Sequence, residues 1–89
     1  MSKMSNKFIE EVIKEAEDTR KIFPAFNSYH EGVAVIMEEM DELWDLVKLN
    51  PNKAGLTQKE YRKMMRSEAK QISAMCLRYA EELCGDDNE

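Results

Sequence analysis

Apolar side chains recur every three or four residues through most of the chain, and this period is typical of amphipathic helices. The first such stretch runs from about 6 to 21, and Pro24 disfavours helix beyond it. Two longer stretches follow, from about 28 to 49 and from about 57 to 84. None shows the two-residue alternation of a half-buried strand. The pattern therefore predicts an all-α chain of three helices.

Start and stop signals bracket the two longer helices. Ser28 and Glu31 have the residue types and the spacing of a capping box, which marks a helix N-terminus. Thr57 and Glu60 repeat this arrangement, and Gly85 is expected to end the last helix. Because a short loop joins two long helices, we predict that they form an antiparallel hairpin.

Length and composition restrict the class of protein. The 89 residues fit a single domain over 1–89, and the ends at 1–5 and 86–89 are expected to fray. Hydrophobic residues make up 43% and charged residues 35%, which is too apolar for a disordered chain and too charged for a membrane protein. A chain of this size buries only about 60–65% of its unfolded surface. Self-association would enlarge such a thin core.

Charge and cysteine usage exclude several partners and favour a cytoplasmic protein. The net charge of −5 argues against a nucleic acid polymer as partner, since phosphate contacts supply most of that affinity. No apolar run is long enough to cross a membrane, and the N-terminus lacks the apolar run of a signal peptide. Cys76 and Cys84 are too far apart on one helix to bridge each other. They are interpreted as reduced packing residues.

The second helix has a wide apolar arc that is expected to face the core. The centre of this arc is formed by Ile36, Met40, Leu43 and Val47. On its flanks lie Val33, Met37 and Trp44 on one side and Val35 and Leu46 on the other. Acidic side chains occupy the opposite, solvated side of the helix, at Glu38, Asp41 and Asp45.

Two carboxylates interrupt the apolar faces. Glu39 falls inside the arc of the second helix, and Glu42 lies at its edge. Glu68 falls inside the apolar face of the third helix, with Gln71 at the edge. A buried carboxylate must be neutralised, paired or bound to a cation, and no basic residue lies nearby on either face. We interpret these residues as oxygen ligands for Mg²⁺ or Mn²⁺. The plainer alternative is that both glutamates extend to solvent or cap a partner helix.

Two short motifs carry a resemblance to a known family. The run Glu38-Glu39-Met40-Asp41-Glu42 matches an EExxE motif in full, and Glu68-Ala69-Lys70-Gln71 matches an ExxD motif except at its last position. In these motifs and the residues around them, from 28 to 83, the chain resembles the MazG-like all-α nucleotide pyrophosphohydrolases, in particular small phage and bacterial MazG-like proteins. The resemblance implies hydrolysis of a nucleoside triphosphate substrate to monophosphate and pyrophosphate. It also implies a helical-bundle homodimer or homotetramer.

The resemblance assigns roles to five residues of this chain. Glu39, Glu42 and Glu68 would be Mg²⁺ ligands, with Gln71 at the fourth motif position. Glu38 would be a further ligand or would position water, so that Glu38, Glu39 and Glu42 form the catalytic set. Gln71 departs from the motif, since an amide oxygen brings no charge and cannot act as a base. The alternative is therefore a catalytically weak or inactive relative that binds nucleotide or metal and has a regulatory role.

Aromatic and basic residues leave further alternatives open. Phe23, Phe26 and Tyr29 are either packing residues or a platform on which a nucleobase stacks. His30 is either exposed near a helix start or a contact at the mouth of the pocket, and Trp44 is interpreted as packing. Arg78 is a basic residue that could contact phosphate or lie on a solvated surface.

Overall fold

The computed structural model describes residues 6–85, and these residues form helices without any strand. The element bounds are α1 Asn6–Ile22, α2 Tyr29–Lys48, α3 Gln58–Tyr79 and a short π-helical continuation of α3, η1 Ala80–Cys84. The all-α prediction is confirmed over this range. The fraying expected at 1–5 and 86–89 concerns positions outside the described residues.

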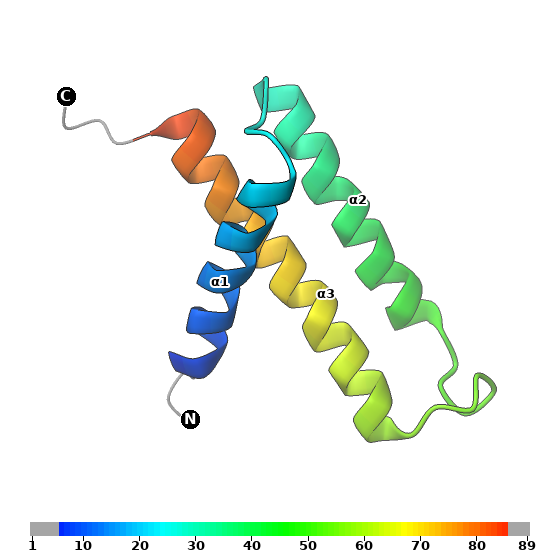
Figure 1. Ribbon diagram of the computed structural model, residues 1–89. Coiled ribbons are helices and arrows are strands. Elements are labelled where there is room, and N and C mark those ends of the chain that lie inside the picture. Colours follow the sequence, from blue (N-terminus) through cyan, green and yellow to red (C-terminus); the bar gives the residue numbers. More distant parts are fainter. Residues whose placement is uncertain (1–5, 86–89) are drawn as a thin grey trace.

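The third helix lies between the other two and packs against both (Figure 1). The start of α2 lies beside the end of α3, where Gly32 faces the side chains of Tyr79 and Leu83. The end of α2 lies beside the start of α3, where the Tyr61 hydroxyl donates to the backbone carbonyl of Leu46. None of the helices in residues 6–85 combines the length and the apolar character needed to cross a bilayer.

The predicted helix starts are confirmed, with one difference in the first cap. Thr57 and Glu60 form the complete capping box of α3. At α2 the Ser28 hydroxyl accepts from the backbone N–H of Glu31 at 3.0 Å. The Glu31 carboxylate, however, accepts from the backbone N–H of Asn27 at 2.7 Å, one residue before the position that a capping box requires. It therefore ties the preceding loop to the helix.

The third helix ends at Cys84, as predicted, but its last turn is not α-helical. The last turn, Ala80–Cys84, is π-helical instead of α-helical. Gly85 then closes the helix with φ 59°, in the left-handed region that glycine tolerates best. The packing role expected for the two cysteines is wrong, because Cys76 and Cys84 are free but both exposed.

The core is small, and it covers only part of the apolar arc of α2. Among the described residues, the buried hydrophobic side chains are Ala16, Ala74 and Met75. From α2, Val35 and Ile36 pack against this core. The arc's other expected central residues are not all buried: Met40 is 48% and Val47 is 50% exposed. The arc is wider than the contact that one neighbouring helix makes, so α3 covers one side of it and leaves the other open.

Close packing of α2 on α3 depends on Gly32. A Cβ added at this position would lie 2.6 Å from Cδ2 of Tyr79. We therefore expect Gly32→Ala to lower the free energy of unfolding by about 1–3 kcal/mol, through overpacking. The higher helix propensity of Ala, worth about 1 kcal/mol, acts in the opposite direction. Urea denaturation measures the net change in the free energy of unfolding. Ala34→Gly, at an exposed site of the same helix, measures the contribution of helix propensity alone. A stability gain in Gly32→Ala would contradict the prediction.

Candidate metal centre

Three carboxylates from two helices converge where α2 faces α3. Glu39 and Glu42 lie one turn apart on α2, and Glu68 comes from α3. One carboxylate oxygen of each lies within 4.8 Å of the others. Glu39 and Glu68 are half-buried, and Glu42 is exposed. The wheel positions predicted this convergence, since Glu39 and Glu68 both fall on the faces that the two helices present to each other.

The carboxylate cluster of Glu39, Glu42 and Glu68 lacks a counterion within residues 6–85. The Oε2 atoms of Glu39 and Glu68 are buried and accept no hydrogen bond. The ion pairs in this part of the chain involve other carboxylates. Unpaired buried carboxylates destabilise a fold unless a cation binds them. Three carboxylates with open oxygens form the ligand set that hard cations such as Mg²⁺ and Mn²⁺ prefer. The residues present therefore fit a divalent cation.

Burial and mutual repulsion change the acidity of the cluster. Burial, together with the charges of Glu42 and Glu68, raises the pKa of Glu39 to about 7. Burial and the adjacent Glu42 carboxylate also raise the pKa of Glu68. A bound divalent cation would act in the opposite direction, because it favours the ionised forms. Cation binding should therefore release protons near neutral pH.

This shift in acidity predicts that Glu39→Gln stabilises the cation-free protein at alkaline pH. The pKa of Glu39 is raised from 4.5 to about 7 on folding, so the folded state binds more protons between these values and stability falls as the pH rises through them. At about pH 8 the penalty is complete, on the order of 2–3 kcal/mol, and the neutral Gln avoids it.

Thermal unfolding in a chelating buffer tests this expectation. Glu38→Gln is the matched control, because Glu38 is the neighbouring glutamate but is exposed and lies outside the cluster. The Glu39→Gln variant should melt above the parent at alkaline pH, and the difference should shrink toward pH 4.5, the ordinary pKa of a glutamate. A melting temperature that is equal to that of the parent at alkaline pH would contradict the prediction.

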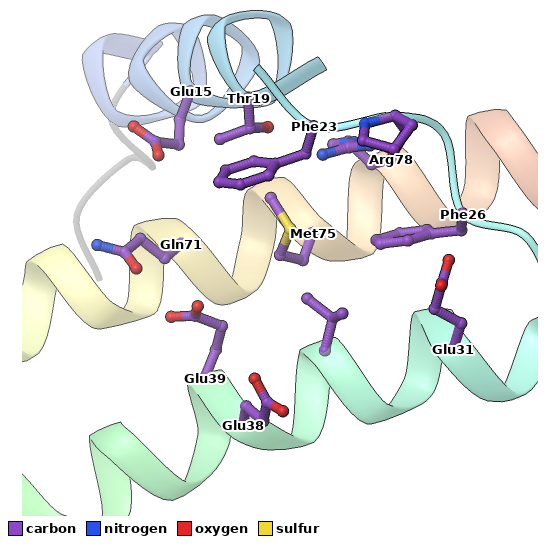
Figure 2. Close-up of a pocket in the computed structure, with 12 residues that line it drawn as sticks. Glu15, Thr19, Phe23, Phe26, Glu31, Glu38, Glu39, Gln71, Met75 and Arg78 are labelled. Atoms are coloured by element: carbon purple, nitrogen blue, oxygen red, sulfur yellow. The ribbon is translucent and has the colours of Figure 1, made fainter. Parts of the chain in front are cut away.

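A cavity of about 510 Å³ adjoins the cluster. It is walled by α1, the loop that follows α1, α2 and α3 (Figure 2). At one end lie the polar side chains of Glu38, Glu39 and Gln71, and Glu39 is directed from α2 toward Gln71 on α3. The other end is aromatic, with Phe26 over α2. The cavity thus joins oxygen ligands to an apolar surface.

The five residues assigned from the sequence divide into two groups. Glu39, Glu42 and Glu68 form the cluster. Glu38 and Gln71 line the cavity together with Glu39, and Glu38 is outside the three-carboxylate group. The structure therefore brings all five to one region. It separates the ligand positions from Glu38, whose role as a further ligand it does not support.

The cavity is also lined by residues that the sequence pattern does not indicate as functional. Glu15 and Thr19 of α1 lie on its wall (Figure 2). In the sequence Glu15 is one of several charged residues of an amphipathic helix, and nothing in its spacing distinguishes it. Its position depends on how α1 crosses α3, which a local pattern does not determine.

The aromatic candidates lie in different environments. Phe23 and Phe26 line the cavity. Tyr29 and His30 are exposed and are not among the lining residues. Trp44 is 57% exposed, with the Lys48 amine 5.6 Å from its ring, so the packing role expected for it is wrong within this chain. The aromatic surface of the cavity therefore comes from the loop that precedes α2.

Arg78 has a structural partner and is not free to bind phosphate. It is only 2% exposed and pairs at 2.8 Å with Glu82, whose side chain is 5% exposed. It also donates to the backbone carbonyl of Pro24 at 3.0 Å and lies over the Phe26 ring. Glu82 in turn accepts from the backbone N–H of Phe26 at 3.0 Å. This pair holds the loop that carries the aromatic end of the cavity. The four-residue spacing of Arg78 and Glu82 was the available sequence signal.

The fold and the site together define an all-α protein with a three-carboxylate candidate metal centre beside a partly aromatic cavity. Comparisons of the chain with protein-family models, with curated proteins and with solved structures found no match. The comparisons therefore identify no family for this chain, and the resemblance to the MazG-like enzymes is one of the two sequence motifs and the residues around them.

Proposed function

We propose that this protein is an Mg²⁺-dependent nucleotide pyrophosphohydrolase that converts a nucleoside triphosphate to its monophosphate and pyrophosphate. The observation that carries the proposal is the convergence of Glu39, Glu42 and Glu68 within 4.8 Å, with unpaired buried oxygens on two of them. The reaction itself is inferred from the resemblance of the EExxE and ExxQ segments to the MazG-like family.

Each residue of the proposed site has its own role in the reaction. Glu39, Glu42 and Glu68 would hold the cation, and Gln71 offers a neutral oxygen beside them. Bound Mg²⁺ supplies positive charge for the phosphate oxygens and Lewis acidity that makes water a better nucleophile. Glu38, which is exposed at the cavity wall and outside the cluster, would accept a proton from the attacking water. The water oxygen joins the α-phosphorus as pyrophosphate leaves.

Two further features of the cavity support a cation-dependent site for nucleotides. Among the described lining residues Arg78 is the only basic one, and Glu82 already neutralises it. A triphosphate in this acidic surrounding therefore requires a divalent cation as a bridge. Phe23 and Phe26 offer flat apolar surface against which a base can stack.

The proposal also includes the arrangement of the helices, the assembly of the chain and its location in the cell. We propose that α2 and α3 form a long antiparallel hairpin and that the chain assembles into a helical-bundle homodimer or homotetramer. The contacts of Gly32 with Tyr79, and of Tyr61 with Leu46, support the hairpin. A cytoplasmic location, without a membrane or nucleic acid polymer as partner, is proposed from the composition.

A substrate screen tests the function. Each common ribonucleoside and deoxyribonucleoside triphosphate is incubated with the full chain and Mg²⁺ or Mn²⁺, and the products are separated by ion-exchange chromatography. Monophosphate with an equal amount of pyrophosphate is the expected result, and it would also name the substrate. Folded protein that yields no product with any nucleotide and either metal would contradict the hydrolase proposal.

Gln71 favours a second candidate function, which is nucleotide or metal binding without turnover. The neutral amide reduces the charge available to hold a cation compared with the Asp of the family motif. This candidate predicts that nucleotide with Mg²⁺ raises the melting temperature, because a ligand that binds the folded state stabilises it. The same solution should contain no product, and steady turnover would exclude this candidate.

A further inference from the structure

Glu15 is a half-buried carboxylate of α1 that lines the cavity but forms no hydrogen bond or ion pair within the described part of the chain. The other half-buried carboxylates of this helix each have a basic partner. Glu11 pairs with Arg66 at 2.8 Å, and Asp18 pairs with Lys14 at 2.8 Å. Since a partly buried carboxylate loses hydration without gaining a partner, the position of Glu15 needs an explanation of its own.

The surroundings of Glu15 in the cavity offer it no basic residue. From α1 it points into the same end of the cavity as Glu39 of α2 and Gln71 of α3 (Figure 2). Arg78 is the only basic residue among the described lining residues, and it is paired with Glu82. Carboxylates that share a cavity repel one another, and a bound cation reverses the sign of that interaction. The charge of Glu15 is therefore available to a cation in this cavity.

The position of Glu15 differs from that of the three expected ligands. Oxygens of Glu39, Glu42 and Glu68 converge within 4.8 Å, and Glu15 does not belong to that group. Mg²⁺ that is held by few carboxylates keeps several waters, and groups around a metal site orient the ligands by hydrogen bonding to them. An ionised carboxylate only accepts hydrogen bonds, which suits it to contact with such waters. The position of Glu15 therefore fits contact through water better than direct coordination.

We propose that Glu15 is an outer ligand of the cation in the candidate metal centre, in contact with it through water, and that it supplies a negative charge that the neutral Gln71 does not. The inference rests on the proposed function, because it requires the cation of that site. It extends the centre from two helices to three, since Glu15 is contributed by α1.

A contribution from α1 has a consequence for the structure. Both α1 and α2 pack against α3, but they have few direct contacts with each other (Figure 1). The cavity is lined by both helices. A cation between Glu15 and Glu39 would attract both carboxylates and so link α1 to α2. Cation binding should therefore restrict the motion of α1 as well as that of the two helices that carry the ligands.

The first test is the binding of Mg²⁺ and Mn²⁺ to the full chain without nucleotide, measured by titration calorimetry. Glu15→Gln should weaken the affinity about tenfold or more, as expected when an outer partner of a metal site is lost. Glu10→Gln is the matched control, because it removes the same charge from an exposed position of α1 that does not line this cavity. Its affinity should equal that of the parent. In a chelating buffer Glu15→Gln should melt no lower than the parent, since it removes no hydrogen bond or ion pair.

Two further variants separate the charge of Glu15 from its shape. Glu15→Asp keeps the carboxylate and should keep most of the affinity. Gln71→Asp, introduced into the Glu15→Gln chain, should return the affinity toward that of the parent, because a fourth carboxylate again lies at this end of the cavity. A double variant that binds no more tightly than Glu15→Gln would overturn the proposal that Glu15 supplies the charge missing at position 71.

Amide hydrogen exchange provides a second test, which uses neither affinity nor activity. At saturating Mg²⁺ the amides of α1 should exchange more slowly in the parent, and Glu15→Gln should lose this slowing while α2 and α3 keep theirs. Equal affinities of the parent and Glu15→Gln, or an equal loss in Glu10→Gln, would overturn the role of Glu15 and leave the metal centre in place. A parent that binds neither cation would overturn the metal centre and this inference together.

Discussion

Glu39→Gln and Glu68→Gln are each expected to lower kcat/KM for nucleotide hydrolysis by about 100-fold or more, on the order of 3 kcal/mol in the activation free energy. Each change keeps the size of the side chain but removes one of the charges that converge within 4.8 Å. The helices should remain folded, because neither carboxylate accepts a hydrogen bond through its buried Oε2 atom.

Steady-state kinetics with the substrate found in the screen measures this loss, and circular dichroism checks the fold. Glu10→Gln is the control for the loss of one negative charge, since Glu10 is an exposed residue of α1 that is not among the residues lining the cavity beside Glu39. The Mg²⁺-dependent rise in melting temperature should fall with the activity. A Glu39→Gln variant as active as the parent would show that Glu39 has no role in the reaction.

Gln71→Asp is the complementary change at the same centre. It restores the last position of the ExxD motif and adds a carboxylate across from Glu39 (Figure 2). A further charged oxygen should tighten Mg²⁺ binding. Titration calorimetry with Mg²⁺ compares the two proteins, and an equal or weaker affinity in Gln71→Asp would show that position 71 does not reach the cation.

Arg78→Met is expected to lower the free energy of unfolding by about 3–5 kcal/mol, the range measured when one partner of a buried ion pair is removed. The change leaves Glu82, whose side chain is only 5% exposed, with Arg20 at 3.5 Å as its remaining counterion, and it removes the donor to the Pro24 carbonyl. The loop that carries Phe23 and Phe26 should loosen with it.

Urea denaturation measures this loss against a matched control. Arg66 also pairs with a glutamate, Glu11, at 2.8 Å, but the Arg66 side chain is 48% exposed. Arg66→Met should therefore cost no more than about 1 kcal/mol. The double variant Arg78→Met/Glu82→Met should recover part of the loss, since it removes the buried carboxylate as well, although the backbone N–H of Phe26 then loses its acceptor. Equal effects of Arg78→Met and Arg66→Met would contradict the importance of the buried pair.

The sequence by itself determined the features that depend on neighbours along the chain. The starts at Ser28 and Thr57 and the stop at Gly85 follow from side-chain and backbone preferences within a few residues. The direction of Glu39 and Glu68 from their helix axes follows from helical periodicity, which is a local property. For this reason two helices, each with a glutamate on its apolar face, were predictable without knowledge of the packing.

Only the tertiary structure decided which surfaces those helices share. The apolar arc of α2 was predicted as one face, but only Val35 and Ile36 pack against the core. The other flank of the arc is exposed, at Val33, Met37, Met40, Trp44 and Val47. The place of Glu15 on the cavity wall and the burial of Arg78 likewise depend on where α1 and its loop cross α3. A helix crossing is set by the fit of side chains that are far apart in sequence, and periodicity within one helix contains no information about that fit.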